Sequence, residues 1–199
     1  MIAEITPLVQ VAGRRVWAVA TSAHIAATTL SAAVLGLVVA AAGVALDVGR
    51  WQVALSAVGG SVLVVCALRD AGVIRCPLPS LDRQTPRWFR RQFSPLCWSF
   101  LWGLDLGQGW TTRILFTGYY GLIVVALLSA NLAIGAGLLA VYGFGRGLPV
   151  LITGLFSRQP GHGRSGPSLA FNQAFLQYLN TAALAFTGMY LLFSWVKPA

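Results

Sequence analysis

The chain has 199 residues, of which 57% are hydrophobic and only 10% are charged, and its formal net charge is +9. Four windows contain no Asp, Glu, Lys or Arg: residues 16–46, 51–68, 114–145 and 165–196. About 20 such residues are enough to cross a bilayer. The composition therefore predicts an integral membrane protein whose 199 residues leave no room for a separate soluble domain. The arginines lie between the apolar windows, where membrane topology accounts for them, so the positive charge does not indicate nucleic-acid binding.

Five membrane helices are expected in chain order. The first covers about residues 16–46 and the second about 51–68, with "DVGR" as the turn between them. The third covers about 97–128, the turn "SANL" leads into a fourth at about 131–156, and the fifth covers about 169–196. The prediction is an all-α polytopic membrane protein with one transmembrane domain over residues 1–199.

Residues 69–96 form a basic loop in this prediction. The segment holds six arginines, two aspartates and three prolines before Phe93. Basic loops stay on the cytoplasmic side. With five spans, the loop shares its side with Arg14, Arg15, Arg158 and Arg164, whereas the other side holds Asp47, Arg50 and Lys197. The expected location is the plasma (inner) membrane, multi-pass, with the N-terminus in the cytoplasm and the C-terminus outside.

The third span carries two charges, Asp105 and Arg113, in "GLDLGQGWTTR". A charged side chain at the centre of a membrane helix costs about 2.5–3.5 kcal/mol on insertion scales. Eight residues on a regular helix rotate the second side chain by about 80° from the first. Gly103, Gly107 and Gly109 are expected to break the helix, and an unwound turn would let the two side chains pair. The alternative is that Asp105 reaches cytoplasmic water.

The fourth span repeats this pattern around Arg146. Gly145 precedes the arginine and Pro149 follows it, and proline removes a backbone donor from a helix. The sequence predicts a second break here, and Arg146 either lines a cavity or reaches lipid phosphate. Together these residues form a candidate polar or transport site: Asp105, Arg113 and Arg146.

Other reactive side chains give weaker indications. His24 is a candidate proton-relay or metal-binding group, but a single histidine without a second ligand is more often packed. Cys66, Cys76 and Cys97 are odd in number and lack paired spacing, so inert thiols are expected in a reducing compartment. The sequence shows no catalytic motif, no metal-ligand cluster and no cofactor motif. Whether the protein is an enzyme stays open, with the balance toward a non-enzyme.

Three stretches resemble the CcdA/DsbD-type membrane thiol–disulfide transporters of cytochrome c biogenesis. They are "GLLAVYGFGRGLPVLITGLF", "FLWGLDLGQGWTTRILFTGYYGLIVVALLS" and "RWQVALSAVGGSVLVVCAL". The resemblance implies a CcdA-like bundle with glycine-broken spans. "WTTR", residues 110–113, stands where the family has Trp-Thr-Pro-Cys, and the family's first span and both of its redox cysteines would be missing.

These observations lead to three functional expectations. The first is a non-catalytic CcdA-like subunit, or a maturation or assembly component, in a membrane complex. Membrane lipids and another membrane protein would be its partners, because faces such as "SAHIAATTLSAAVLG" suit close helix approach. The alternative is a small-solute or ion transporter, and the third is transmembrane thiol–disulfide electron transfer.

Overall fold

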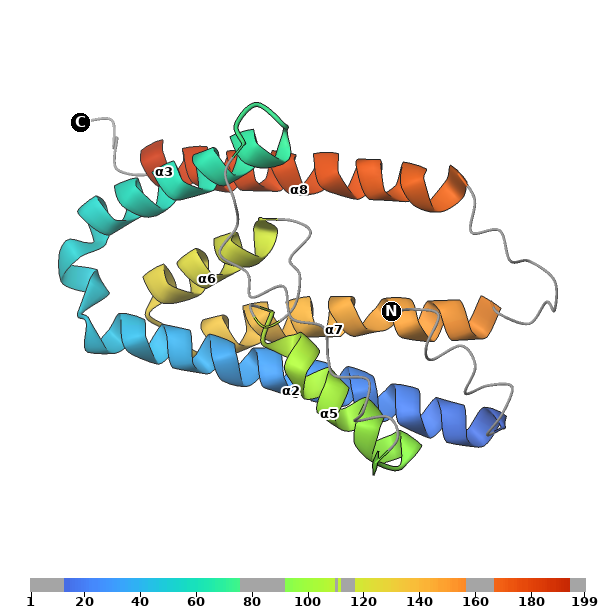
Figure 1. Ribbon diagram of the computed structural model, residues 1–199. Coiled ribbons are helices and arrows are strands. Elements are labelled where there is room, and N and C mark those ends of the chain that lie inside the picture. Colours follow the sequence, from blue (N-terminus) through green and yellow to red (C-terminus); the bar gives the residue numbers. More distant parts are fainter. Residues whose placement is uncertain (1–12, 76–91, 110, 112–116, 157–166, 194–199) are drawn as a thin grey trace. The chain divides into compact units, whose positions relative to one another are not determined.

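The computed structural model describes residues 13–75, 92–109, 111, 117–156 and 167–193. Within these ranges the protein is helical and has no β-strand, which confirms the all-α prediction (Figure 1). The elements are α2 (Arg14–Ala45), the short 3-10 helix η1 (Val48–Trp51), α3 (Gln52–Asp70), α5 (Pro95–Gly107), α6 (Gly118–Ser129), α7 (Leu132–Phe156) and α8 (Pro167–Phe193).

Three of the described helical segments are long and apolar enough to cross a membrane: Arg15–Ala45, Val48–Asp70 and Leu132–Ile152. They correspond to the predicted first, second and fourth spans. The predicted third span differs, because α5 has 13 residues and α6 has 12. At 1.5 Å per residue each is about 20 Å long, shorter than the roughly 30 Å hydrocarbon core. The count of five spans stays a prediction.

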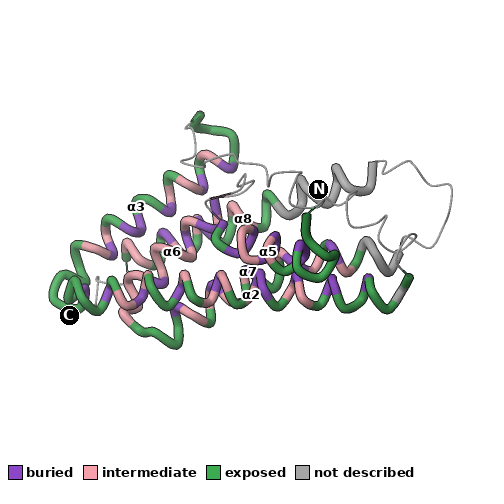
Figure 2. Tube along the Cα trace, turned by 60° about the horizontal axis from the view of Figure 1, so that its bottom comes forward, coloured by how far each residue is buried: buried purple, intermediate pink, exposed green. Residues whose placement is uncertain are grey.

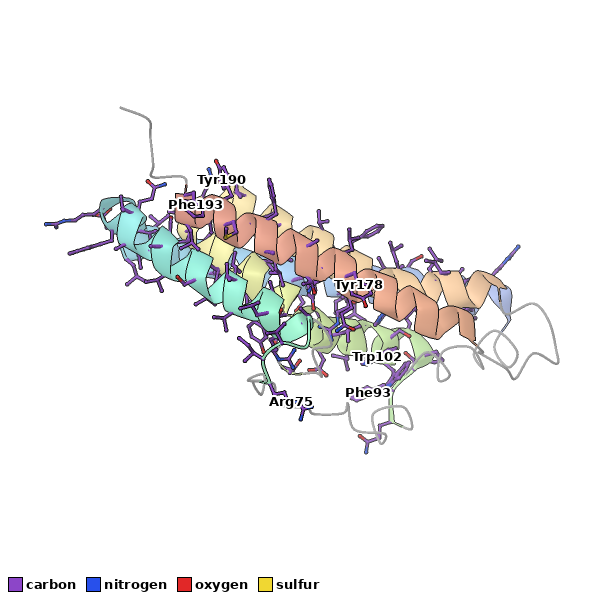
Figure 3. All side chains as sticks on the ribbon, turned by 90° about the horizontal axis from the view of Figure 1, so that it is seen from above. Arg75, Phe93, Trp102, Tyr178, Tyr190 and Phe193 are labelled. Atoms are coloured by element: carbon purple, nitrogen blue, oxygen red, sulfur yellow. The ribbon has the colours of Figure 1, made fainter. Side chains whose placement is uncertain are left out.

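Exposed positions recur along the long helices (Figure 2), and many of them are large apolar residues. Val141 on α7 is 73% exposed and Phe186 on α8 is 77% exposed. Figure 3 shows three more exposed side chains on α8, namely Tyr178, Tyr190 and Phe193. Extensive exposed apolar surface on long helices is unfavourable in water and suits lipid. The fold therefore indicates a membrane protein.

The chain divides into two compact units. Unit 1 comprises Met1–Leu35, Ser80–Arg113 and Ala136–Gly163, and unit 2 comprises Gly36–Pro79, Ile114–Gly135 and Arg164–Ala199. Unit 1 thus contains α5 with most of α2 and α7, whereas unit 2 contains α3, α6 and α8. The transmembrane domain over residues 1–199 stays a prediction.

Unit 1 is held together by aromatic packing and by glycines that let helices approach. Its buried hydrophobic group comprises Trp17, Trp98, Trp102 and Val150. On α5, a Cβ added at Gly103 would lie 2.5 Å from the carbonyl oxygen of His24, and one at Gly107 would collide with the carbonyl of Thr28. These two glycines therefore bring α5 against the backbone of α2.

In unit 2, glycines likewise let α3 and α8 approach closely. A Cβ added at Gly60 would lie 2.8 Å from the carbonyl oxygen of Gly188. Leu63, Ala67 and Leu184 form the buried group beside this crossing. The small residues of "SAVGGSVLVV" on α3 thus allow α8 to approach closely.

Candidate functional site

A buried carboxylate joins three helices of unit 2. Asp70, the last residue of α3, is only 5% exposed. Its Oδ2 accepts hydrogen bonds from the backbone N–H of Thr117 at 2.9 Å, from the Thr117 hydroxyl at 2.8 Å and from the Asn180 side-chain amide at 2.8 Å. Its Oδ1 lies 3.0 Å from the Arg69 guanidinium.

The surroundings of Asp70 define what the carboxylate does. Thr117 is the N-cap residue of α6, where backbone N–H groups lack helical partners and the helix dipole favours a negative charge. The Gln177 amide on α8 adds a hydrogen bond of 2.6 Å to the Asp70 carbonyl. The carboxylate meets hydrogen-bond donors rather than further acceptors, which suits the joining of helices and not the binding of a cation.

Sequence reasoning missed this site. It ended the second span at residue 68 and assigned Asp70 to the basic loop 69–96, whereas α3 continues through Asp70. A usable signal was present in the apolar span 169–196, where Gln177 and Asn180 are amides three residues apart. Two such groups on one face of a membrane helix require polar partners.

A second polar group lies in unit 1, around His24. His24 is fully buried on α2, and its Nδ1 lies 3.1 Å from the carbonyl oxygen of Ser99 on α5. A carbonyl can only accept, so Nδ1 carries the proton of this hydrogen bond. When the ring is neutral, Nε2 therefore presents a bare lone pair. Trp102 lies against the ring with centroids 4.7 Å apart, and Trp98 stacks on Trp102 at 5.2 Å.

Among the described residues of unit 1, four buried polar atoms have no hydrogen-bond partner: His24 Nε2, Trp17 Nε1, Thr21 Oγ1 and Ser99 Oγ. We call these four residues the His24 cluster. Trp17, Thr21 and His24 are spaced by four and three residues and share one face of α2. Buried polar atoms in native proteins nearly always have a partner, so the cluster is suited to a small polar ligand. His24 is packed, as its sequence context favoured, but sequence reasoning did not consider Trp17 and Thr21 on the same face of the helix.

The predicted pairing of Asp105 with Arg113 is untested, because Arg113 lies outside the described residues. Asp105 is half-buried in α5, and its backbone carbonyl accepts a 2.8 Å hydrogen bond from the Thr111 hydroxyl. Helix α5 ends at Gly107, and Gly109 follows with φ of +74°. The chain therefore leaves the helix at "GQG", with Gly109 in a conformation that suits glycine.

The other predicted break is absent. Helix α7 runs continuously through Gly145 and Pro149. Arg146 is half-buried and donates a 2.8 Å hydrogen bond to the Tyr142 hydroxyl, one turn earlier on the same helix. Its guanidinium carbon also lies 5.8 Å from the centre of the Tyr142 ring. That Arg146 belongs to a polar or transport site stays a prediction.

The described residues contain no group of three or more His, Cys, Asp or Glu that could hold a metal ion. Cys66 is half-buried and Cys97 is exposed. Cys76 lies outside the described residues, as does most of the basic loop.

Comparison with known proteins gives partial matches to three curated relatives. The Methylamine utilization protein MauF of Methylorubrum extorquens is 28% identical over 123 residues, which cover 62% of this chain and 43% of the relative. MauF of Methylophilus methylotrophus is 32% identical over 85 residues, or 43% of this chain and 30% of the relative. MauF of Paracoccus versutus is 33% identical over 79 residues, which cover 40% of this chain and 29% of the relative. The chain thus spans less than half the length of these relatives. No family model matches the chain, and no solved structure matches it.

These matches correct the resemblance to the CcdA/DsbD-type transporters, which was wrong. Glycine-rich apolar helices with an occasional proline are common in membrane proteins generally. The specific part of the family pattern, Pro-Cys, was missing at "WTTR". Thiol–disulfide electron transfer and a link to cytochrome c biogenesis depended on that resemblance and fall with it. What the comparisons support is that this helical membrane chain is similar, over part of its length, to MauF methylamine utilization proteins.

Proposed function

We propose that this chain is a non-catalytic accessory component of amine utilization that acts within the membrane beside another membrane protein. The observation that carries the proposal is the similarity to three MauF proteins, each named for methylamine utilization. An accessory role in maturation or assembly fits a membrane bundle whose best-defined buried charge, Asp70, is engaged in joining helices.

The proposal includes a topology. The chain would cross the plasma membrane several times, with its N-terminus and the basic segment 69–96 in the cytoplasm. The support is the distribution of arginines between apolar segments. The exposed apolar side chains of α3 and α8 would face lipid or the partner subunit.

Deletion of the gene from its own host tests the accessory role. Growth with methylamine as the nitrogen source should fail, growth with ammonium should be normal, and the intact gene supplied on a plasmid should restore growth. Equal growth of the deleted and parent strains on both sources would refute the proposal. A tagged copy purified in mild detergent should bring down a membrane partner in fixed proportion.

A transport role is the second candidate. Half-buried Asp105 and Arg146 lie in apolar helices, where charges often mark a solute path. The polar site would comprise Asp105, Arg113 and Arg146. Uptake of a solute into vesicles that contain only this protein, abolished by Arg146→Gln, would favour the transporter over the accessory subunit.

A further inference from the structure

We propose that the His24 cluster binds a short primary amine of the size of methylamine, as the neutral molecule, between α2 and α5. The cluster lies within unit 1 and uses none of the residues predicted for the polar site. Its four unpartnered atoms come from two helices that pack directly, since the His24 ring touches both Ser99 and Trp102 of α5.

The donor and acceptor types in the cluster define the ligand. Trp17 Nε1 can only donate, and His24 Nε2 can only accept once Nδ1 donates to Ser99. The hydroxyls of Thr21 and Ser99 do either. A ligand that satisfies the set must therefore both donate and accept. A neutral primary amine does so: its lone pair accepts from the indole N–H, and its N–H groups donate to Nε2 and to a hydroxyl.

Packing around the cluster limits the size of the ligand. Trp102 lies 4.7 Å from the His24 ring, and a Cβ added at Gly103 would lie 2.9 Å from Ala27 Cβ. Helices this close exclude a large ligand. The indoles of Trp17, Trp98 and Trp102 form an apolar group that suits a methyl substituent.

The choice of an amine, among small molecules that both donate and accept, rests on the proposed function in amine utilization. Water has the same hydrogen-bonding character without the methyl group. The experiment must therefore show whether methylamine or water occupies the cluster. It must also test methylamine binding independently of the accessory role.

The test is equilibrium binding of radiolabelled methylamine to the full chain in detergent. Binding should saturate, and excess unlabelled methylamine should compete whereas tetramethylammonium, which has neither N–H groups nor a lone pair, should not. Thr21→Val and Ser99→Ala should each weaken binding by about five- to tenfold, the loss expected for one hydrogen bond.

Thr29→Val is the matched control. It makes the same change on the same helix, but the Thr29 hydroxyl already donates to the Ile25 carbonyl at 2.8 Å. The affinity of the Thr29→Val variant for methylamine should equal that of the parent protein. Absence of saturable binding by the folded parent would mean that water alone occupies the cluster, and equal affinities in all variants would place the amine elsewhere; either result overturns the inference. Growth on methylamine and co-purification of a partner test the accessory role separately. If the protein does not bind methylamine but the deleted strain still fails to grow on it, this inference is refuted and the accessory role stands.

Discussion

The carboxylate of Asp70 accepts both the backbone N–H and the hydroxyl of Thr117, at 2.9 and 2.8 Å, across 47 residues of sequence. This relationship fixes the start of α6 to the end of α3, because the carboxylate holds the N-cap residue of α6 by its N–H and by its hydroxyl. Removing it would leave the buried N–H of Thr117 and the half-buried amide of Asn180 without this acceptor, whereas the Thr117 hydroxyl would keep the Cys66 carbonyl at 3.2 Å.

Asp70→Ala should therefore destabilise the protein by about 3 kcal/mol or more, because each abandoned buried donor costs about 1–3 kcal/mol. The measurement is the thermal unfolding midpoint in detergent. Asp47→Asn is the control, because Asp47 is exposed, makes no capping hydrogen bond and has φ of 48°, which asparagine tolerates. Equal midpoints for the two variants would show that the Asp70 joint contributes nothing.

Two glycine-to-alanine substitutions should have opposite effects. Gly107→Ala should lower the unfolding midpoint, because the new Cβ would collide with the Thr28 carbonyl of α2. Gly145→Ala should raise stability by up to about 1 kcal/mol, because its Cβ would meet nothing within 4 Å and alanine favours the helix. A stabilising Gly107→Ala would contradict the close approach of α5 and α2.

Two threonine-to-valine substitutions separate satisfied from unpartnered hydroxyls on α2. Thr28→Val should cost about 1 kcal/mol, because the Thr28 hydroxyl donates to the His24 carbonyl at 2.7 Å. Thr21→Val should leave ligand-free stability unchanged or higher, since its buried hydroxyl has no partner. Denaturant titration of both variants without amine measures the difference. A Thr21→Val variant less stable than Thr28→Val would be the contrary result.

The proposed topology can be checked by labelling single cysteines. The background would be the triple variant Cys66→Ala, Cys76→Ala, Cys97→Ala, which should insert and function normally. Val73→Cys, at a position 71% exposed, should resist a membrane-impermeant thiol reagent in intact cells.

Gly49→Cys, in the turn between α2 and α3, should react with that reagent in intact cells. Glycine 49 has open space around a new Cβ, so the side chain is accessible. The reverse labelling pattern would invert the proposed orientation.

The sequence predicted the helices whose signal is local. Charge-free runs located α2 and α3 to within a few residues, and the turn "SANL" located the start of α7, because hydropathy and turn signals depend on neighbouring residues alone. It could not separate α5 from α6, since both are apolar and the change at Gly109 is one of backbone conformation. Pro149 suggested a break that α7 does not have, because a helix interior can accommodate proline when neighbouring groups satisfy the freed carbonyl.

The polar clusters were harder to predict because their partners are distant in sequence. Asp70 and Asn180 are 110 residues apart, and His24 and Ser99 are 75 apart. Sequence reasoning chose Asp105 and Arg146 as candidates because they are charged residues in apolar runs, and their part in a site stays a prediction. It passed over Asp70, which stands at the edge of such a run where a solvated loop was the ordinary expectation.

The Asp70 joint also has a consequence for biogenesis. Asn180 is added to the chain 110 residues after Asp70. At translation rates of about 5–20 residues per second, Asp70 would exist for roughly 5–20 seconds before its α8 partner is made. During that interval Arg69, the adjacent residue, is the partner already at hand. A nascent chain stopped before α8 would therefore hold α3 with an Asp70 that lacks its hydrogen bonds from Gln177 and Asn180.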